Sequence, residues 1–297
     1  MGQDAEFRSG QVGIVGRPNV GKSTLLNRLV GQKLSITSRR PQTTRHPIRG
    51  IVSTPVAQCV FVDTPGFQGR FANALGGAMN RAVTSSLAEV DVVVLVIIAG
   101  RYLQEDENVT RRLSAEKPLI VAMNKVDRVS DRSTLLAHIE GLAARLPARA
   151  FIPVCAQDGY QLDELMREIV RALPVREATF PDHQLTDRDE RFFAGEFIRE
   201  KLFRALGDEI PYATAVTIDR FEELGRLRRI HATILVDKSS HKAIVIGEHG
   251  ERLKAIASSA RRDLEALYAG KVYLQVWVKV RRGWSDDRGE LKRLGYA

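Results

Sequence analysis

Eight residues near the start of the chain have the types and the spacing that bind phosphate. The stretch from Gly16 to Ser23 reads GRPNVGKS and matches G-x-x-x-x-G-K-[ST] at every fixed position. The two glycines let the backbone curl, so that successive N–H groups point inward and form a concave anion site. Lys22 can then neutralise the outer phosphates, and the Ser23 hydroxyl can bind Mg²⁺. A plain glycine-rich turn is the alternative, and the Lys-Ser pair between a strand and a helix disfavours it.

A second motif, Asp63-Thr64-Pro65-Gly66, supplies a carboxylate and a tight turn at the end of a predicted strand. The carboxyl end of a strand after a P-loop is where a Mg²⁺ partner and a γ-phosphate sensor are expected. We expect Asp63 to hold the metal through a water molecule and the Gly66 N–H to face the γ-phosphate. An ordinary turn is the alternative, and the position downstream of the P-loop favours the functional interpretation.

A third motif, Asn124-Lys125-Val126-Asp127, has the pattern N-K-x-D and follows another predicted strand. The Asp127 carboxylate can accept two hydrogen bonds from the ring N–H and the exocyclic amino group of guanine, while the stem of Lys125 packs on the base. Adenine lacks these donors and would leave the carboxylate desolvated and unpaired, which costs about 1–3 kcal/mol. A surface turn is the alternative interpretation of these four residues.

The segment Cys155-Ala156-Gln157 ends the next predicted strand, where G-domains usually have Ser-Ala-Lys. A backbone N–H of that motif meets the guanine oxygen, and the departures at Cys155 and Gln157 leave such a contact available. The predicted nucleotide-binding residues are therefore Gly16, Arg17, Pro18, Asn19, Val20, Gly21, Lys22, Ser23, Thr24, Asp63, Thr64, Pro65, Gly66, Phe67, Asn124, Lys125, Val126, Asp127, Cys155 and Ala156.

Together these motifs are typical of a small GTPase domain. Hydrolysis of GTP by this domain without a partner is predicted to be slow. Ras-like GTPases have a water-orienting glutamine directly after Asp-x-x-Gly, whereas this chain has Phe67 there, and Gln68 is in the wrong register. The attacking water must then be placed by backbone groups, by a monovalent cation or by a partner. Asn19 is a candidate K⁺ ligand by its similarity to other GTPases that lack the glutamine, and it is equally well a polar loop residue.

These motifs lie at the ends of elements that alternate between strand and helix. Apolar residues predict a strand before the P-loop (Val12, Ile14, Val15) and a helix after it (Leu25, Leu26, Leu29). Further strands are predicted at Gly50–Thr54, Ala57–Val62, Val92–Ile98, Pro118–Met123 and Ala150–Val154, and helices at Asp106–Ser114, Ser133–Leu146 and Gln161–Leu173. Lys33 to Arg49 reads as a mobile polar loop. The alternation predicts an α/β fold with a mostly parallel sheet and helices on both faces.

A linker is predicted after the last of these helices, because residues 175–187 have little periodic hydrophobicity. A helix capped by Asp187 or Thr186 follows, and Gly207 ends it. Strands are then predicted at Ala213–Phe221 and Arg228–Asp237, helices at Glu251–Ala257 and Ser259–Tyr268, and a last strand at Lys271–Arg281. The chain is thus divided into an N-terminal tail (1–10), a G-domain (11–174), the linker and a second domain (188–297).

The second domain carries the motif G-x-x-G from Gly247 to Gly250. Its order, helix–strand–strand–helix–helix–strand with G-x-x-G between the two middle helices, resembles a type II K-homology (KH) domain, a small α+β module. In that module the turn clamps the backbone of single-stranded RNA beside an apolar groove. A turn that only joins two helices is the alternative. The predicted RNA-binding residues are Lys242, Ile246, Gly247, Glu248, His249, Gly250, Arg252 and Lys254, of which acidic Glu248 departs from the basic residue common there.

Composition and charge favour a polyanionic partner. The chain has 297 residues and a formal net charge of +9, and from Lys238 onward it has 13 Lys and Arg against 7 Asp and Glu. Charge alone does not distinguish nucleic acid from an acidic membrane surface. Cys59 and Cys155 form no CxxC pair, so we expect no disulfide framework or zinc site and a reducing cytoplasm. The ten residues before Gln11 contain no apolar core of the secretory kind, so we expect no secretory signal among them.

Together the two halves resemble the Era family of bacterial GTPases from Gln11 to Tyr296. The segments that carry the resemblance are GRPNVGKSTLLNRL, SRRPQTTRH, FVDTPG, NKVD, the KH domain and the terminal run from Trp277. The resemblance implies a GTPase that uses GTP, GDP and Mg²⁺ and acts in maturation of the small ribosomal subunit by binding near the 3′ end of 16S rRNA. It also implies a cytoplasmic protein, peripheral on the inner membrane in some members, and we expect a monomer.

The resemblance assigns the switch threonine that meets Mg²⁺ to Thr44, or failing it to Thr43. The predicted catalytic set is then Lys22, Thr44, Asp63 and Gly66, and the predicted metal set is Ser23, Thr44 and Asp63. Pro47 departs from the basic residue usual in that loop. We hypothesise that GTP and Mg²⁺ order the loop from Arg39 to Arg49 and the segment after Gly66, and thereby gate RNA binding.

Two other function classes are alternatives. One is a membrane-tethered signalling GTPase whose basic half meets lipid, although the chain has no long amphipathic basic helix or lipidation signal. The other is a tRNA-modification enzyme with a GTPase module, although no constellation for substrate chemistry is visible outside the G-domain.

Overall fold

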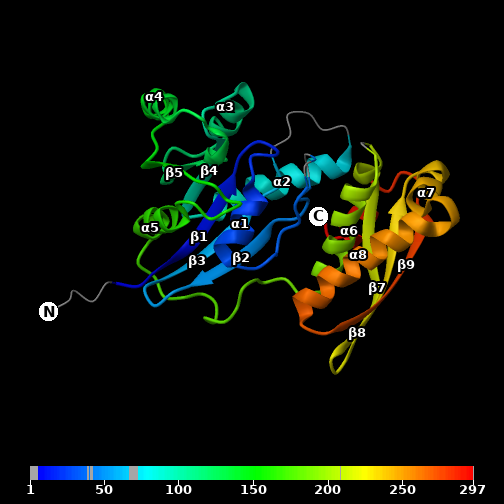
Figure 1. The fold of residues 1–297 in the computed structure, drawn as a ribbon. Coiled ribbons are helices and arrows are strands. Elements are labelled where there is room, and N and C mark those ends of the chain that lie inside the picture. The colour runs from blue at the N-terminus through cyan, green and yellow to red at the C-terminus, as the bar shows by residue number, and fades with distance from the viewer. Residues whose placement is uncertain (1–5, 39, 41–42, 67–72, 208, 297) are drawn as a thin grey trace. The chain divides into compact units, whose positions relative to one another are not determined.

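The structure is a computed structural model that describes residues 6–38, 40, 43–66, 73–207 and 209–296. These residues form two compact units, drawn as a ribbon in Figure 1. The first unit contains residues 6–35, 44–66 and 80–187, and the second contains residues 36–38, 40, 43, 73–79, 188–207 and 209–296. Within these described ranges, no helix combines the length and the apolar character needed to cross a bilayer.

A six-stranded sheet forms the centre of the first unit, in the order β2-β3-β1-β4-β5-β6. β2 pairs antiparallel with β3 and the other pairings are parallel, which confirms the predicted mostly parallel sheet. All residues of β3 and β5 are buried, as expected for strands covered on both faces. The strands are β1 (Arg8–Val15), β2 (Ile48–Ser53), β3 (Ala57–Asp63), β4 (Val92–Ile98), β5 (Leu119–Asn124) and β6 (Ala150–Pro153).

The helices of this unit are α1 (Lys22–Val30), α2 (Ala74–Glu89), α3 (Gln104–Thr110), α4 (Arg132–Ala143) and α5 (Leu162–Ala172), with a 3-10 turn η1 (Val126–Arg128). The first residues of α2, up to Met79, group with the second unit. The sequence analysis did not predict α2. Its sequence, ALGGAMNRAVTSSLAE, contains two adjacent glycines, which disfavour a helix, and its apolar residues show only a weak helical period.

The segment 175–187, predicted as a linker, is hydrogen-bonded to strands of the first unit. The buried side chain of Gln58 accepts from the N–H of Phe180 at 2.9 Å and donates to the carbonyl of the same residue at 2.7 Å. The N–H of Ile51 donates to the carbonyl of Leu185 at 2.8 Å. The segment is therefore fixed to β2 and β3 over much of its length.

The second unit has a three-stranded sheet in the order β7-β8-β9, in which β7 and β8 are antiparallel and β8 and β9 are parallel. Its helices and strands follow the KH order, so the predicted small α+β domain is confirmed. The elements are α6 (Glu190–Ala205), the 3-10 turn η2 (Ile210–Ala213), β7 (Thr214–Leu224), β8 (Leu227–Val236), α7 (Ser239–Ile246), the 3-10 turn η3 (Glu248–Gly250), α8 (Glu251–Tyr268), β9 (Lys271–Val280) and α9 (Arg288–Arg293).

Two details of this unit differ from the sequence prediction. The N-cap of α6 is Asp189, whose side chain accepts from the N–H of Phe192 at 2.7 Å, and neither Thr186 nor Asp187 caps it. The predicted break at Ser258 does not exist, because α8 is one continuous helix. Its buried residues Ile256, Ala260 and Leu264 recur every four positions, so one face packs on the core throughout.

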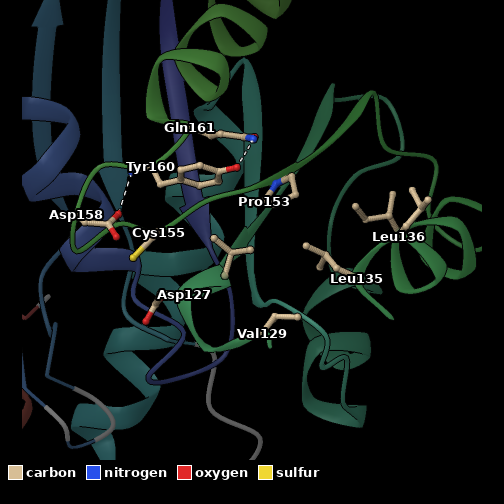
Figure 2. Close-up of a pocket in the computed structure, with 11 residues that line it drawn as sticks. Asp127, Val129, Leu135, Leu136, Pro153, Cys155, Asp158, Tyr160 and Gln161 are labelled. Carbon is tan, nitrogen blue, oxygen red and sulfur yellow. Dashed lines mark hydrogen bonds between the residues drawn. The ribbon is translucent and has the colours of Figure 1, made fainter. Parts of the chain in front are cut away.

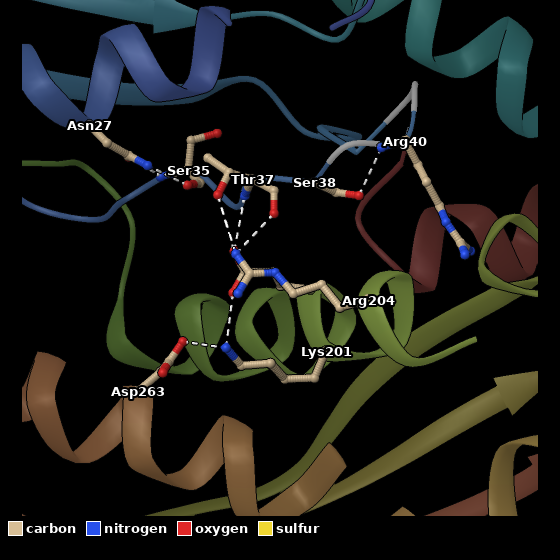
Figure 3. Close-up of polar contacts among 9 residues, drawn as sticks. Asn27, Ser35, Thr37, Ser38, Arg40, Lys201, Arg204 and Asp263 are labelled. Atoms are coloured by element: carbon tan, nitrogen blue, oxygen red, sulfur yellow. Dashed lines mark hydrogen bonds and ion pairs between the residues drawn. The ribbon is translucent and has the colours of Figure 1, made fainter. Parts of the chain in front are cut away.

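The buried carboxylate of Glu200 lies at the centre of a polar network in the second unit. It accepts from the N–H of Thr37 at 3.1 Å, from Arg204 at 3.0 Å and from Lys201 at 3.2 Å (Figure 3). Ile36, which precedes Thr37, is fully buried in the core of the same unit. This part of the segment predicted as a mobile polar loop is therefore packed.

Candidate nucleotide-binding site and RNA interface

The P-loop is the turn between β1 and α1, and its geometry requires its two glycines. Gly16 and Gly21 have φ values of 150° and 105°, which residues with a side chain rarely adopt. A Cβ at Gly21 would lie 2.3 Å from Nδ2 of Asn124, and one at Gly16 would lie 2.4 Å from the carbonyl oxygen of Val96. No side chain of the described residues caps the first turn of α1, so its N–H groups suit an anion.

The Lys22 side chain lies inside the P-loop. Its Nζ donates to the carbonyls of Gly16 at 2.9 Å and Arg17 at 3.1 Å. Burial lowers the pKa of Lys22 to about 8, and the negative charge of Asp63 opposes part of that shift. A Cβ at Gly66 would lie 3.5 Å from this Nζ. Lys22 and Gly66, both predicted to act at the γ-phosphate, are therefore brought together.

Two of the three predicted metal ligands, Ser23 and Thr44, contact one carboxylate oxygen of the third, Asp63. Ser23 Oγ donates to Asp63 Oδ2 at 2.7 Å, Thr44 Oγ1 donates to the same oxygen at 3.4 Å, and the two hydroxyls are 3.1 Å apart. Asp63 is fully buried, and its Oδ1 has no hydrogen-bond partner in the described part of the chain. Burial raises the pKa of Asp63. Two hydroxyls and a carboxylate with an unpaired oxygen make the hard donor set that Mg²⁺ prefers.

Thr44, not Thr43, directs its hydroxyl to this carboxylate, because Thr43 donates instead to the carbonyl of Arg40 at 2.9 Å. A further hydroxyl, that of Ser35, donates to Asp63 Oδ2 at 2.6 Å. Ser35 is not among the site residues predicted from the sequence. A serine in a loop without hydrophobic periodicity gives no signal that it lies beside a carboxylate from a distant strand.

Asn124 joins the N-K-x-D turn to the P-loop and to the turn after β6. Its Nδ2 donates to the carbonyl of Val20 at 2.7 Å, and its Oδ1 accepts from the N–H groups of Lys125 at 2.8 Å and Ala156 at 3.0 Å. Lys125 Nζ donates to the carbonyl of Asn19 at 2.7 Å. One of the backbone N–H groups of the segment predicted to meet the guanine oxygen, that of Ala156, is thus bonded to Asn124 in this structure.

A cavity of about 500 Å³ lies next to the predicted base site. Figure 2 shows Asp127, Cys155 and Tyr160 among the residues that line it, with Leu135 and Leu136 on its apolar side. Burial raises the pKa of the Cys155 thiol. Asp127 and Cys155, which the sequence assigned to base recognition from two separate motifs, therefore line one cavity.

Arg17 directs its guanidinium toward α3. Its Nε donates to Asp106 Oδ2 at 3.0 Å, and the same carboxylate oxygen accepts from the N–H of Leu103 at 3.0 Å. The sequence analysis assigned Arg17 to nucleotide binding and missed Asp106. The two residues are 89 positions apart, and no sequence pattern connects them.

Some predicted residues lie outside the described part of the chain. These are Phe67 and Gln68, on which the prediction of slow hydrolysis depends, and Arg39 in the loop before Thr44. The remaining residues of the second motif are described: the Thr64 hydroxyl donates to the carbonyl of Ile14 at 3.1 Å and ties the end of β3 to β1.

The G-x-x-G turn joins α7 to α8 in the second unit. Gly247 and Gly250 have φ values of 75° and 79°, and a Cβ at Gly247 would lie 2.7 Å from Cβ of Arg252. The side chains of Glu248 and His249 are each 88% exposed. Within the described residues, no side chain caps the first turn of α8. An exposed glycine turn before an uncapped helix suits a phosphate backbone.

The other predicted RNA-binding residues differ in exposure. Arg252 and Lys254 are exposed at the start of α8, whereas Lys242 and Ile246 on α7 are partly buried. Ile244 on α7 is 40% exposed, and the sequence analysis did not assign it to the interface. Its spacing from Ile246 gives no signal, because residues two positions apart on an α-helix do not share a face.

Comparison with protein families places the two halves separately. Residues 11–125 match the family described as 50S ribosome-binding GTPase, and residues 209–285 match the KH domain family. The GTPase Era of Nitrosomonas eutropha is 48% identical over 290 residues, which cover 98% of each chain. The GTPase Era of Pseudomonas aeruginosa PAO1 is 48% identical over 293 residues, which cover 98% of this chain and 96% of that one.

Two solved structures resemble the whole chain. An Aquifex aeolicus Era variant bound to GDP·AlF4⁻ has a TM-score of 0.94 at 36% identity and covers 98% of this chain and 100% of its own. An Era complex with MgGDPNP and nucleotides 1506–1542 of 16S ribosomal RNA has a TM-score of 0.93 at 36% identity and covers 98% of this chain and 99% of its own. With the P-loop, the guanine motif and the KH domain in place and with relatives 48% identical over 98% of its length, the chain belongs to the GTPase Era family.

Proposed function

We propose that this GTPase is an RNA-binding switch that acts in 16S rRNA processing and in assembly of the small (30S) ribosomal subunit. The observation that carries the proposal is the Era complex with MgGDPNP and nucleotides 1506–1542 of 16S rRNA, which this chain matches over 98% of its length. The proposed RNA ligand is single-stranded rRNA near the 3′ end. The exposed G-x-x-G turn of the second unit supports this choice.

In the proposed nucleotide site, the N–H groups of the P-loop and of the first turn of α1 bind the phosphates. The ammonium of Lys22 would exchange its present acceptors, the carbonyls of Gly16 and Arg17, for phosphate oxygens. A neighbouring anion raises the pKa of a buried lysine, so the ammonium form persists once nucleotide is bound. Asp127 would select guanine, and Lys125 would pack on the base.

Ser23 and Thr44 would hold Mg²⁺ directly, and Asp63 would hold it through a water molecule. When bound, this ion neutralises charge on the β- and γ-phosphate oxygens. The Gly66 N–H would donate to the γ-phosphate, next to Lys22. Because Phe67 carries no hydrogen-bonding group, the attacking water must be placed by backbone groups, by K⁺ or by a partner, and intrinsic hydrolysis is slow.

For K⁺ the proposed ligand is Asn19, whose carbonyl already accepts from Lys125. Hydrolysis measured in KCl and in NaCl at equal ionic strength tests this assignment. A faster rate in KCl that is lost in Asn19→Ala supports it, and equal rates of the unmodified protein in the two salts reject it.

In the proposed RNA interface, phosphates approach the main chain at Gly247 and Gly250, and the N-terminus of α8 attracts them. Lys242, Arg252 and Lys254 would supply the positive charge that offsets Glu248. Bases would lie on the apolar surface of α7. This surface includes Ile246, as predicted from the sequence.

The two binding activities are proposed to be linked, so that the GTP-bound protein holds RNA more tightly than the GDP-bound protein. Linkage is reciprocal, so RNA must tighten GTP binding by the same factor. We also propose a cytoplasmic monomer that associates peripherally with the inner membrane through its basic surface. Co-sedimentation with anionic vesicles, with and without RNA, tests the last point, because RNA that occupies the same surface must reduce vesicle binding.

The main test is the affinity for a short fluorescent oligonucleotide of the 16S rRNA 3′ end, measured with a non-hydrolysable GTP analogue and with GDP. A scrambled oligonucleotide of equal length is the control, and the titration is repeated at two salt concentrations because phosphate contacts weaken with added salt. Identical affinity with the two nucleotides rejects the switch. Equal affinity for the scrambled oligonucleotide rejects rRNA as the specific ligand.

A further inference from the structure

The carboxylate of Asp63 receives three hydroxyl groups on one of its oxygens. Ser23 contacts Oδ2 at 2.7 Å, Thr44 at 3.4 Å and Ser35 at 2.6 Å, so the Ser35 contact is the shortest. Ser23 and Thr44 have a proposed role as metal ligands through their oxygen lone pairs. Ser35 is fully buried and lies outside that ligand set, and its hydroxyl is bonded to the carboxylate alone among the described contacts of this side chain.

The backbone of Ser35 is held by one side chain of α1. Asn27 Oδ1 accepts from the N–H groups of Leu34 at 2.9 Å and Ser35 at 2.8 Å, and its Nδ2 donates to the carbonyl of Ser35 at 2.7 Å. Figure 3 shows Asn27 reaching Ser35. Only one orientation of the carboxamide satisfies all three bonds, because the reversed group would place its NH2 against two N–H donors. Both backbone polar groups of Ser35 are thus fixed.

One face of α1 carries both Asn27, which holds the backbone of Ser35, and the proposed metal ligand Ser23. Ser23 and Asn27 are four residues apart on α1 and therefore lie on the same side of the helix. The helix thus positions two hydroxyls at Asp63. Ser23 belongs to the helix itself, and Ser35 is held in position by Asn27 of the helix. The two hydroxyls approach the same oxygen, Oδ2, and leave Oδ1 without a partner in the described chain.

We propose that Ser35 is a positioning residue of the magnesium site, which fixes the Asp63 carboxylate so that Oδ1 stays available to the water molecule through which Asp63 would hold the metal, and that Asn27 fixes Ser35. The inference rests on the Mg²⁺-dependent guanine-nucleotide binding proposed above. It extends the site by two residues that belong neither to the proposed nucleotide-binding set nor to the proposed metal set. Groups that orient a metal-binding carboxylate typically contribute 10–100-fold to metal affinity, although they make no bond to the ion.

The test is the release of a fluorescent N-methylanthraniloyl GDP from the full chain at increasing Mg²⁺ concentrations. We expect Mg²⁺ to slow release from the unmodified protein, and the concentration that gives half of the effect reports metal affinity in the complex. For Ser35→Ala we expect this concentration to rise about 10–100-fold. The release rate in EDTA should stay unchanged, because the hydroxyl acts only through the metal site. That metal-free rate also shows that the variant is folded and binds nucleotide.

Ser9→Ala is the matched control. Ser9 lies on β1 of the same unit and is 1% exposed, and its hydroxyl has no hydrogen-bond partner in the described chain. Ser9→Ala therefore deletes a buried serine hydroxyl, as Ser35→Ala does, but one that does not contact the Asp63 carboxylate. We expect an unchanged Mg²⁺ midpoint for this variant.

Asn27→Ala tests whether Asn27 positions Ser35. The change removes three hydrogen bonds to the backbone of residues 34 and 35 but does not delete the Ser35 hydroxyl. We expect the Mg²⁺ midpoint to shift in the same direction as in Ser35→Ala. The double variant should exceed the larger single shift by less than twofold, because both changes release one carboxylate.

The outcomes separate the inference from the proposed function. If Mg²⁺ does not slow release from the unmodified protein, the proposed Mg²⁺-dependent binding is wrong. If Mg²⁺ slows it and the midpoint is equal in Ser35→Ala, or shifts equally in Ser9→Ala, the positioning role of Ser35 is wrong. Fully multiplicative shifts in the double variant would show that Asn27 acts independently of Ser35.

Discussion

Arg17 and Asp106 form an ion pair at 3.0 Å that joins the P-loop to α3. Asp106 is fully buried, whereas 15% of the Arg17 side chain is exposed. The Arg17 charge lies close enough to Lys22 to lower the pKa of that lysine, and the charge of Asp106 raises it again. The pair therefore fixes the start of the P-loop and limits the positive charge beside Lys22.

Removal of the Asp106 carboxylate should destabilise the nucleotide-free protein. Asp106→Ala leaves the Arg17 guanidinium largely desolvated and unpaired, and we expect it to lower the free energy of unfolding by about 3–5 kcal/mol. Urea unfolding monitored by circular dichroism measures the loss. Arg111→Ala, at the C-cap of the same helix, is the control: that side chain is 70% exposed, and its ion pair with Glu107 should be worth less than about 1 kcal/mol. Equal losses in the two variants would contradict this account.

The buried ammonium of Lys22 should make stability depend on alkaline pH. Its pKa is about 8 in the folded protein and 10.5 in the unfolded chain, so the unfolded state binds more protons between these values. The cost of the buried charge is therefore complete below pH 8 and disappears as the pH rises toward 10.5.

Replacement of Lys22 by the neutral methionine should remove this pH dependence. Lys22→Met is expected to raise the free energy of unfolding of the nucleotide-free protein by about 1–3 kcal/mol at pH 7, and the advantage should shrink by pH 10. Urea unfolding at the two pH values measures it. With GDP and Mg²⁺ the order should reverse, since the variant loses phosphate binding. A variant less stable than the unmodified protein at pH 7 without nucleotide would argue against the buried charge as the cause.

Base preference should depend on Asp127. In Asp127→Asn the amide donates where the carboxylate accepted, so xanthine, which carries an oxygen in place of the exocyclic amino group, is preferred. We expect the ratio of XTP to GTP affinity to change at least about tenfold. Competition against fluorescent GDP measures the ratio. Asp158→Asn changes a second carboxylate of the same cavity and should leave the ratio unchanged. An altered ratio in Asp158→Asn would show that base preference depends on the charge of the cavity and not on Asp127 specifically.

RNA binding should depend on the backbone at Gly247. Gly247→Asp places a side chain at a φ of 75° and 2.7 Å from Cβ of Arg252, and adds negative charge where phosphate should approach. We expect at least a tenfold loss of RNA affinity with unchanged GDP affinity, because a like charge and a displaced backbone both act on the phosphate.

The matched control for that variant is Gly225→Asp. Gly225 has a φ of 61° in the turn between β7 and β8, and a Cβ there would meet no atom within 4 Å. Both changes add one negative charge at a residue with a positive φ, but Gly225→Asp makes no close contact and its position lies outside the proposed interface. Equal losses of RNA affinity in the two variants would show that charge or strain alone explains the effect.

The sequence predicted the centre of the sheet of the first unit well because β4 and most of β5 are continuous apolar runs. The run Val92–Ile98 matches β4 at both ends, and the other predicted strands and helices are shifted by no more than four residues at either end, apart from the split in α8. Such runs need no partner to be recognised, since burial on both faces acts on every residue. The phosphate motif is equally local, because its glycines and its lysine follow one another in the chain.

The contacts that the sequence missed are those between residues far apart in the chain. Ser35 meets Asp63, and Arg17 meets Asp106, only after the sheet has brought distant loops to one edge. Asp189 caps α6 through local geometry, but the neighbouring Asp187 and Thr186 are chemically equivalent candidates. Composition and periodicity do not rank such candidates.

The carboxamide of Gln58 sets the point at which the GTPase portion can be cut away for separate study. This side chain is fully buried, and Phe180 supplies partners for both its oxygen and its nitrogen. In a fragment that ends at Pro174, just after α5, the buried Gln58 carboxamide would lose its hydrogen bonds to Phe180. Each lost bond should lower the free energy of unfolding by about 1–3 kcal/mol. A fragment that ends at Asp187 keeps the thirteen residues 175–187, which hydrogen-bond to β2 and β3. We expect this longer fragment to be the more stable of the two.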